Sequence, residues 1–281
     1  MTEILKTTHY QLVDARHGRF LANPADKYIG QSVIRYGEFS EIEWDLLNQI
    51  IKPGAIVVEA GANMGSFTVP IAKKAGLKGM VYAFEPQIAI FHQLCANLAL
   101  NDLLNVQAFN AGCGDQPGWL PIKRLNPAQP NNYGGFSLEA LKNENSELKV
   151  RIEALDDVLD VPRLNLIKAD VEGMELQVLR GAAGLIADHR PYLYLEANEA
   201  EASADLYNYL KGLSYDMYWH LPRMFNPKNH RGDAEDLFPG IVSMNIMCIP
   251  SERDTKLNGF REVADENDHP KRWWAERDAQ K

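Results

Sequence analysis

The sequence predicts an α/β fold with a mainly parallel sheet, and three observations carry this prediction. Short apolar runs of strand length alternate with longer segments of helical periodicity between residues 55 and 210. A glycine-rich loop stands where the first of these runs turns into a helix. The chain has 281 residues, 46% of them hydrophobic, which is enough for a large core without disulfides or metals. Such alternation produces βαβ units with right-handed crossovers.

The apolar runs and the helical periodicity give the order of the elements. Strands are expected at 55–59, 80–84, 106–109, 164–168 and 191–196, and closing, antiparallel strands at 215–220 and 243–249. Helices are expected at 65–74, 87–100, 173–180 and 200–210. An earlier helix should begin after Ser40, because Glu43 follows it at the spacing of a capping box. Gly181 is the expected C′ residue of the helix over 173–180.

Changes in composition divide the chain into three segments. Residues 1–50 are mixed and polar and should form a cap or lid, residues 51–250 the α/β domain, and residues 251–281 a charged tail. Residues 116–151 are rich in Pro, Asn and Gly, so an inserted loop or hairpin is expected there. The tail should be mobile except where Trp273 and Trp274 dock, over a ligand crevice or against the second subunit of a homodimer.

The charge balance argues against two classes of partner. The chain has 29 Lys and Arg against 38 Asp and Glu, a net charge of −9, which repels both nucleic acids and anionic membranes. The 3 cysteines are widely spaced and match neither a disulfide framework nor a zinc motif. Residues 1–10 lack the apolar core of a signal peptide, and no stretch is apolar enough to span a membrane. A cytoplasmic protein is therefore expected.

The glycine-rich loop follows the first predicted strand. Glu-Ala-Gly-Ala-Asn-Met-Gly (59–65) has the spacing E-x-G-x-x-x-G and lacks the G-x-G-x-x-G fingerprint of dinucleotide-binding proteins. Gly61 would let the backbone approach a ligand closely, and Gly65 would let the next helix pack tightly on the strand. Glu59 suits a cationic amino-acid group, and Glu85, 24 residues after Gly61, is placed for a ribose diol. The simpler interpretation of the loop is a tight turn with an ordinary solvated carboxylate. The presence of both Glu59 and Glu85, each at the carboxyl end of a strand, disfavours it.

Several segments carry a family resemblance. They are Val-Val-Glu-Ala-Gly-Ala-Asn-Met-Gly-Ser-Phe (57–67), Tyr-Ala-Phe-Glu-Pro (82–86), Asn-Ala-Gly-Cys-Gly-Asp (110–115), Gly-Gly-Phe-Ser-Leu (134–138), Leu-Asp-Asp-Val-Leu (155–159) and Ile-Lys-Ala-Asp-Val-Glu-Gly-Met-Glu (167–175). Together they resemble the FkbM family of S-adenosylmethionine-dependent methyltransferases. The resemblance implies a class I methyltransferase, Rossmann-like fold: a seven-stranded, mostly parallel sheet with one antiparallel strand and helices on both faces. It also implies S-adenosylmethionine as cofactor and methyl transfer, usually to a hydroxyl oxygen.

The resemblance also implies which residues contact the cofactor. The methionine portion would be lined by residues of the glycine loop, namely Glu59, Gly61, Ala62, Asn63 and Gly65. The ribose and the adenine edge would contact Glu85, Pro86, Asn110 and Ala111. Tyr36 and Glu38, which precede the domain, would cover the cofactor as a lid. Glu59 stands where the family more often has Asp, and Ala169 where Ile is usual, but neither change alters the cofactor assignment.

Asp170 is the main candidate for the chemistry. It ends the strand over 164–168, where the order of the strands should reverse, so its side chain should face the crevice there. An alcohol acceptor is weakly acidic, so a base must take its proton or a metal must polarise it. Asp170 would be that base, or would hold a divalent ion together with Glu172. A metal is not favoured, because the sequence shows no dense carboxylate trio.

Two further residues near this chemistry have simpler interpretations. His220 is a second candidate base, because imidazole titrates near neutral pH, but a histidine among aromatic residues is more often a hydrogen-bonded structural residue. Glu175 is expected only to stabilise the positive end of the helix that it begins.

The sequence thus predicts an S-adenosylmethionine-dependent O-methyltransferase acting on a hydroxyl of a sugar, a glycan, or a glycosylated or polyketide-like metabolite. One alternative is methylation of a nitrogen or a carboxylate on a small metabolite. Another is a non-catalytic nucleoside-binding module, although such a module has no need of both the glycine loop with Glu85 and the crevice at Asp170. A dehydrogenase using NAD would need the dinucleotide fingerprint, which the sequence lacks.

Overall fold

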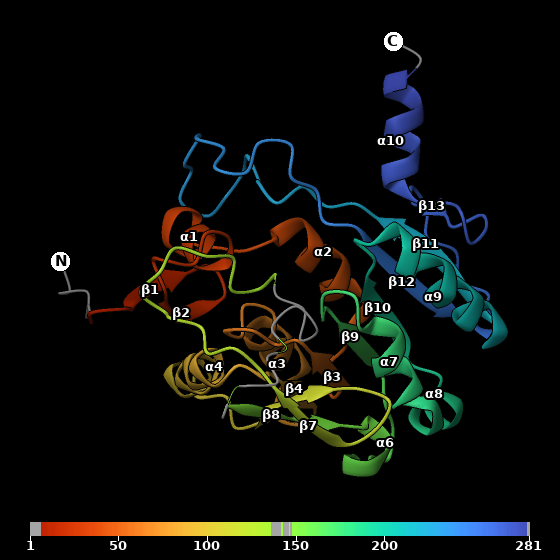
Figure 1. Ribbon diagram of the computed structural model, residues 1–281, viewed down its shortest axis with the longest axis horizontal. Coiled ribbons are helices and arrows are strands. Elements are labelled where there is room, and N and C mark those ends of the chain that lie inside the picture. Colours follow the sequence, from red (N-terminus) through yellow and green to blue (C-terminus); the bar gives the residue numbers. More distant parts are fainter. Residues whose placement is uncertain (1–6, 136–141, 143–145, 147, 280–281) are drawn as a thin grey trace.

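A central sheet runs through the middle of the molecule and organises the fold. The computed structural model describes residues 7–135, 142, 146 and 148–279. The sheet has eight strands in the order β13-β11-β12-β10-β9-β3-β4-β5, with helices on both sides (Figure 1). Their bounds are β3 (Ile56–Ala60), β4 (Met80–Phe84), β5 (Val106–Phe109), β9 (Leu166–Ala169), β10 (Tyr192–Glu196), β11 (Tyr215–His220), β12 (Asn245–Pro250) and β13 (Arg261–Glu262).

The predicted strand pattern is confirmed. All pairings from β5 through β4, β3 and β9 to β10 are parallel, whereas β12 runs antiparallel to both β10 and β11. The short strand β13 adds to the outer edge of β11, also antiparallel. The core of the sheet is therefore the seven-stranded, mostly parallel arrangement with one antiparallel strand that the sequence predicts. Its edge carries one short strand more.

Helices cover both faces, so that neighbouring residues of a central strand are buried on opposite sides. The helices are α1 (Ile29–Tyr36), α2 (Glu41–Ile50), α3 (Thr68–Ala75), α4 (Ile88–Leu100), α6 (Leu155–Val158), α7 (Glu175–Arg180), α8 (Ala183–His189), α9 (Ala200–Gly212) and α10 (Pro270–Ala279). Val57 packs with side chains of α2 and α3, and Val58 with side chains of α7, α8 and α9. This double burial explains why the strands are continuous apolar runs rather than alternating ones.

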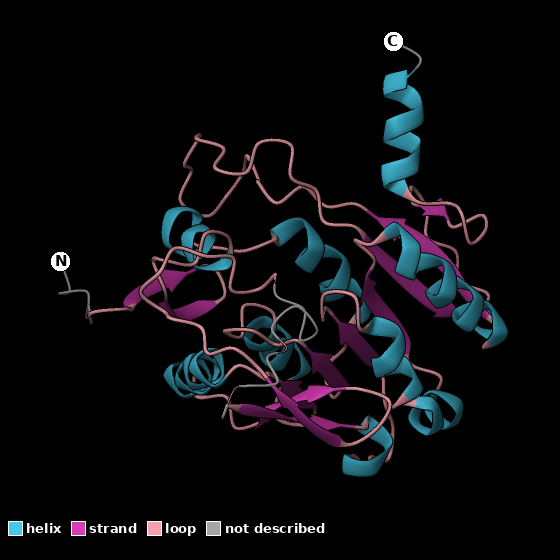
Figure 2. Ribbon diagram, viewed as in Figure 1, coloured by secondary structure: helices cyan, strands magenta, loops and turns pink. Residues whose placement is uncertain are grey.

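The N-terminal segment and the insertion contain more structure than the sequence predicts. Before α2, the only helix expected there, lie a hairpin of β1 (Gln11–Ala15) and β2 (Gly18–Ala22), and helix α1. The insertion contributes to a small separate sheet of β6 (Ala111–Cys113), β7 (Gly118–Pro121) and β8 (Lys149–Glu153), visible beside the central sheet in Figure 2. Strands β7 and β8 pair antiparallel, as in the hairpin that is one of the two expectations for the insertion. Strands β1 and β2 mix polar and apolar residues, so no continuous apolar run marks them in the sequence. Residues 136–138, part of a segment that carries the resemblance, lie outside the described residues.

Two predicted helix ends have a different geometry in the structure. Ser40 has φ of 45°, and its hydroxyl donates to the Glu43 carboxylate at 3.0 Å instead of capping a backbone N–H. Gly181 has φ of −73°, so it is not a left-handed C′ residue, because the chain continues into α8. A Cβ atom there would lie 2.0 Å from the backbone oxygen of Gly114. Close packing between backbones, not left-handed geometry, therefore requires this glycine.

The C-terminal tail has regular structure beyond the sheet. It contributes β13 and then α10, which projects from the body of the molecule (Figure 1). The indole N–H of Trp273 donates to Asp268 at 2.7 Å, and its ring packs edge-on against Trp219 of β11. Both predicted tryptophans pack against the core next to β11, and neither lines the cavities described below. Among the described residues no helix is both long and apolar enough to cross a membrane.

Candidate active site

The glycine loop lies where β3, β4 and β9 end side by side. Gly61 has φ of +83°, and its N–H donates to the backbone oxygen of Phe84 at 3.0 Å. A Cβ on Gly61 would lie only 1.9 Å from the backbone oxygen of Asp170. A Cβ on Gly65, at φ of +88°, would lie 2.9 Å from the side chain of Leu94 on α4. Both glycines therefore allow close approach within the protein itself: Gly61 toward the end of β9, and Gly65 toward α4.

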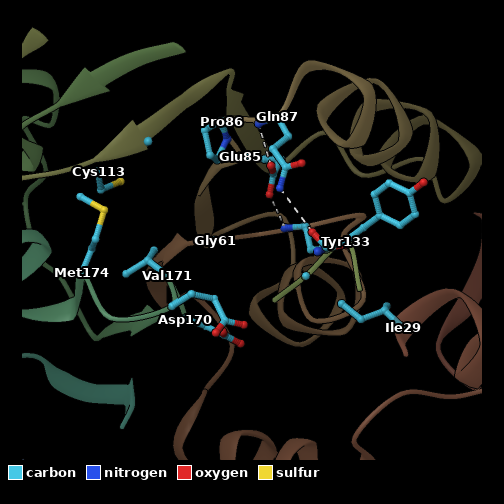
Figure 3. Close-up of a pocket in the computed structure, with 14 residues that line it drawn as sticks. Ile29, Gly61, Glu85, Pro86, Gln87, Cys113, Tyr133, Asp170, Val171 and Met174 are labelled. Carbon is cyan, nitrogen blue, oxygen red and sulfur yellow. Dashed lines mark hydrogen bonds between the residues drawn. The ribbon is translucent and has the colours of Figure 1, made fainter. Parts of the chain in front are cut away.

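Glu85 follows β4 and is buried beside this loop. Its carboxylate accepts hydrogen bonds from the backbone N–H groups of Asn63, at 3.0 Å, and Gln87, at 2.8 Å (dashed in Figure 3). Burial raises the pKa of Glu85 to about 7. The side-chain amide of Asn110 donates to the backbone oxygens of Glu85 and Pro86 at 2.9 and 3.1 Å. Asn110 thus fixes the loop that carries Glu85.

A cavity, called here the first cavity, opens between these loops (Figure 3). It is lined by Ile29, Gly61, Asn63, Glu85, Pro86, Gln87, Gly112, Cys113, Tyr133, Gly134, Asp170, Val171, Glu172 and Met174. Four of the predicted cofactor residues line it: Gly61, Asn63, Glu85 and Pro86. Asn110 and Ala111, the pair predicted to contact the adenine, do not line it, whereas the neighbouring Gly112 and Cys113 do.

A second cavity, the acidic cavity, adjoins the first. Its charged lining residues are Glu43, Glu59, Lys168, Asp170, Glu172 and Glu196, and Ala62 and Asn245 also line it. The two cavities share Ile29, Gly61, Asn63, Gly134, Asp170 and Glu172. The lining is therefore continuous from Glu85 on one side of the glycine loop to Glu59 on the other.

A buried lysine that the sequence analysis does not single out lies at the floor of the acidic cavity. Lys168 is 2% exposed, and its ammonium lies 3.1 Å from Asp170 Oδ2 and 3.9 Å from Glu43 Oε1. It also faces Glu59, because the two residues pair across β9 and β3. These carboxylates hold the pKa of Lys168 above its usual value despite its burial. The signal in the sequence was a single lysine inside an apolar strand, since a buried lysine requires anionic partners.

Glu59 and Glu43 share the positive charge of Lys168. Glu59 is 1% exposed and accepts a hydrogen bond from the Thr68 hydroxyl at 2.6 Å. Burial raises the pKa of both carboxyl groups to about 7, against the opposing effect of Lys168. Near neutral pH a large fraction of each is therefore protonated.

Glu196 completes a carboxylate trio that the sequence analysis missed. One carboxylate oxygen from each of Asp170, Glu172 and Glu196 lies within 4.8 Å of the other two. The expectation that no dense trio exists is wrong, because Glu196 ends the neighbouring strand β10 and is remote in sequence. Burial, and then the charge of Asp170, raise the pKa of Glu172 to about 8 and raise that of Glu196 as well. Glu172 has φ of 56°, a left-handed backbone geometry that is strained for a residue other than glycine.

Glu175 binds the loop that precedes its own helix. Its carboxylate accepts hydrogen bonds from the backbone N–H groups of Val171 and Gly173, at 3.1 and 3.3 Å. It therefore stabilises the loop that presents Asp170 and Glu172.

His220 occupies a structural position in the sheet. Its Nδ1 shares a hydrogen bond of 2.7 Å with the hydroxyl of Tyr194, and its ring contacts Phe260. Burial lowers its pKa to about 4, so the imidazole is neutral and a weak base at physiological pH. It lines neither cavity that Asp170 lines.

Tyr36 and Glu38 lie beside the cavities rather than over them. The Tyr36 hydroxyl donates to the backbone oxygen of Glu235 and accepts from the N–H of Leu237, both at 2.8 Å. Glu38 pairs with Arg16 at 2.7 Å and accepts hydrogen bonds from the Asn226 side chain and the His230 N–H. Neither residue lines the two cavities. Both hold the segment between β11 and β12 against the N-terminal segment, where Figure 1 shows the two passing close together.

The match to known proteins agrees with this geometry. A family model described as the methyltransferase FkbM domain matches residues 59–217, more than half of the chain. The chain belongs to the FkbM methyltransferase family. S-adenosylmethionine is the cofactor of this class of enzyme.

Individual relatives are similar over part of their length. The chain is 32% identical to "Methyltransferase 1" of Beauveria bassiana over 146 residues, covering 45% of this chain and 58% of that protein. It is 31% identical to "Methyltransferase sdnD" of Sordaria araneosa over 176 residues, covering 51% of this chain and 65% of that protein. The chain thus spans less than two thirds of either relative. A crystal structure of methyltransferase FkbM from Methylobacillus flagellatus aligns with a TM-score of 0.48 and 20% identity, over 69% of this chain and 44% of that one.

Proposed function

We propose that this FkbM-family chain transfers the methyl group of S-adenosylmethionine to a hydroxyl of a sugar, a glycan, or a glycosylated or polyketide-like metabolite. One observation carries the proposal: Asp170 lines both the first cavity, which holds the acid suited to a ribose, and the acidic cavity beside it. A carboxylate at this junction is within reach of a hydroxyl that approaches the methyl group. The asparagine amides and carboxylates of the acidic cavity are also the acceptors and donors that sugar hydroxyls need.

The described residues fit the cofactor. The Glu85 carboxylate, already held by two backbone N–H groups, would accept the hydrogen bonds of the ribose hydroxyls. Gly112 and Cys113 would contact the adenine, and the side of the glycine loop that faces Glu59 would contact the methionine portion. Binding of an α-ammonium group beside Glu59 would favour the ionised form of its carboxyl group.

Asp170 would act on the acceptor. The bound cofactor supplies an electrophilic methyl group, and the protein must align the acceptor oxygen with it. Lys168 holds Asp170 Oδ2 at 3.1 Å, which fixes the orientation of the carboxylate. Asp170 would then accept the proton of the acceptor hydroxyl, with Glu172 beside it in the same cavity. His220 remains a weaker candidate, because its hydrogen bond to Tyr194 and its low pKa favour a structural role.

Asp170→Asn tests this assignment. The acceptor is first identified with the wild type, by transfer of the tritiated methyl group of S-adenosylmethionine into pooled metabolites and glycans and mass spectrometry of the labelled product. With that acceptor, we expect the turnover of Asp170→Asn to be lower than that of the wild type by about a hundredfold or more, the usual scale for a lost general base. Affinity for S-adenosylhomocysteine, measured by calorimetry, should stay within a few-fold. Asp157→Asn, a change at an exposed aspartate, is the matched control. Full turnover in Asp170→Asn would reject the role of Asp170, and binding of NAD without the adenosyl ligand would reject the function.

A cationic amine is the second candidate acceptor, and the charge of the acidic cavity favours it. Glu43, Glu59, Asp170, Glu172 and Glu196 face a single lysine there. The same excess of carboxylates disfavours a carboxylate acceptor, because like charges repel. The labelled product separates the candidates, since a methylamine keeps a basic nitrogen and binds to a cation exchanger, whereas a methyl ether of a neutral acceptor does not. A methyl ester alone hydrolyses in base.

A further inference from the structure

We propose that Asp170, Glu172 and Glu196 together bind one divalent cation of the Mg²⁺ or Mn²⁺ type. The inference rests on the proposed function, because the cation would lie beside the acceptor hydroxyl. Its starting point is geometry: one oxygen from each carboxylate lies within 4.8 Å of the other two. Oxygens on opposite sides of Mg²⁺ are about 4.2 Å apart, and those around the larger Ca²⁺ about 5 Å, so the trio already has the size of a first coordination sphere.

The individual carboxylates have oxygens to offer. Glu196 Oε1 accepts a hydrogen bond from the Asn198 side chain, whereas its Oε2 is buried without a hydrogen-bond partner among the described residues. Asp170 Oδ2 accepts a hydrogen bond from the Lys168 ammonium, so the other carboxylate oxygen of Asp170 is left for a ligand. A buried carboxylate oxygen without a partner is costly, and a cation in the cavity would satisfy it.

Asn245 provides a second, independent observation. It is 4% exposed, lines the acidic cavity with the trio, and its Nδ2 has no hydrogen-bond partner among the described residues. Asn245 pairs directly with Glu196 across β12 and β10, so the two side chains lie on the same face of the sheet. The oxygen and nitrogen of an amide are assigned from the surrounding hydrogen bonds, and here those bonds do not fix them. With its oxygen toward the trio, Asn245 would add a neutral oxygen of the kind that Mg²⁺, Mn²⁺ and Ca²⁺ accept.

The cationic side chain in the acidic cavity does not neutralise the whole trio. Lys168, whose ammonium already serves Asp170 and Glu43, is the one cationic side chain among the described residues that line the acidic cavity. Glu172 and Glu196 are thus left without a cationic partner there. They also line the outer cavity, which opens on the far side beside Gly173, Asn198 and Glu199. A cation at the trio would therefore lie between two cavities, with room for water or an acceptor hydroxyl to complete its coordination.

Binding of Mn²⁺ to the full chain tests the inference without relying on activity. The protein is freed of metal with a chelator, dialysed and titrated with MnCl₂, while electron paramagnetic resonance measures the free ion. We expect one Mn²⁺ per chain with a dissociation constant below about 1 mM. Glu196→Gln and, independently, Glu172→Gln should weaken binding at least about tenfold. Glu199→Gln, at an exposed carboxylate on the rim of the outer cavity, is the matched control and should bind within twofold of the wild type.

The outcomes separate the cation site from the proposed function. Absence of stoichiometric Mn²⁺ binding to the wild type, or equal binding by both Gln variants and the wild type, overturns the site. An equal loss in Glu199→Gln also overturns it, since the binding would then reflect general surface charge. Calorimetry with S-adenosylhomocysteine on the chelated protein runs in parallel. Binding of that ligand without Mn²⁺ binding rejects the site alone, whereas Mn²⁺ binding without it supports the site and rejects the function.

Discussion

Replacing Lys168 by Met tests whether one buried ammonium stabilises the acidic cavity. The substitution keeps the length and apolar body of the side chain but removes the ammonium, which also lies 4.7 Å from the centre of the Phe67 ring. It removes the cation that faces Glu43, Glu59 and Asp170. Removing one partner of a buried ion pair costs about 3–5 kcal/mol, because the remaining charge stays desolvated. We expect a loss of that size in the free energy of unfolding at pH 8.

The loss in the free energy of unfolding caused by Lys168→Met should be smaller in weak acid than at pH 8, because Glu43 and Glu59 become protonated there. The pKa of Glu43 and of Glu59 is about 7 in the folded protein, above an unfolded value near 4.5. The stability that the protonated forms contribute is therefore fully present below pH 4.5 and is lost as the pH rises through 7. Without Lys168 both pKa values rise further, so both groups are neutral at pH 6 and need no cation. The loss at pH 6 should be about 1–3 kcal/mol, less than at pH 8.

Urea unfolding of the wild type and Lys168→Met at pH 6 and pH 8 measures both quantities. Lys78→Met, at an exposed lysine, is the matched control and should change stability by less than about 0.5 kcal/mol. A loss below about 1 kcal/mol at pH 8 would show that Lys168 does not neutralise the cavity. An equal loss at both pH values would show that Glu43 and Glu59 do not titrate together with it.

Three further predictions concern other parts of the site. Gly61→Ala should lower the free energy of unfolding by about 3 kcal/mol or more in urea, because its Cβ would meet the Asp170 backbone oxygen at 1.9 Å. Gly259→Ala, at a nearly equal φ of +85° but with no described atom within 4 Å, should lose only about 1–2 kcal/mol, and equal losses would contradict this explanation. His220→Phe should lower stability by about 1–3 kcal/mol, since the buried Tyr194 hydroxyl loses its partner, and should leave turnover within tenfold; a hundredfold fall would restore His220 as the base. Calorimetric affinity for S-adenosylhomocysteine should increase from pH 6 to pH 8, as Glu85 with its pKa of about 7 becomes the better acceptor. Glu85→Gln should weaken this dependence and leave the part due to Glu59, whose pKa is also about 7; an unchanged dependence would exclude Glu85 as a source.

Local sequence patterns predicted the parts of the fold that depend on local interactions. The central strands are buried on both faces, so their apolar runs are unambiguous and their predicted limits differ from the observed ones by only a few residues. The hairpin of β1 and β2 was missed because polar and apolar residues mix in its two five-residue strands, so neither forms a continuous apolar run. The capping geometry at Ser40 was also wrong, because the spacing of a capping box does not determine the backbone angle of its first residue.

In the candidate site, too, the residues that follow predicted strands could be identified from the sequence, whereas those brought together by strand pairing could not. Glu85 and Asp170 follow strands directly, and the order of strands in a parallel sheet brings such residues to one edge. Glu196 was missed because it joins Asp170 only through the pairing of β10 with β9, which no local pattern encodes. Gly61 was identified as a position that needs glycine, but the neighbour that requires it is the backbone of Asp170, which lies far away in sequence.

The contact between the N-terminal segment and the segment before β12 has a consequence for how acceptor preference can change. Met224, Ile241 and Ser243 of the later segment line the acidic cavity. That segment is attached to α1 by Arg35, which pairs with Asp233 and Glu235 at 2.8 Å across about 200 residues of sequence. Together the two segments form one connected wall of the acidic cavity, to which the N-terminal segment contributes Tyr28, Ile29 and Phe39. Grafting both from another member of the family should transplant a new acceptor preference, whereas grafting one alone would break the ion pairs that join them.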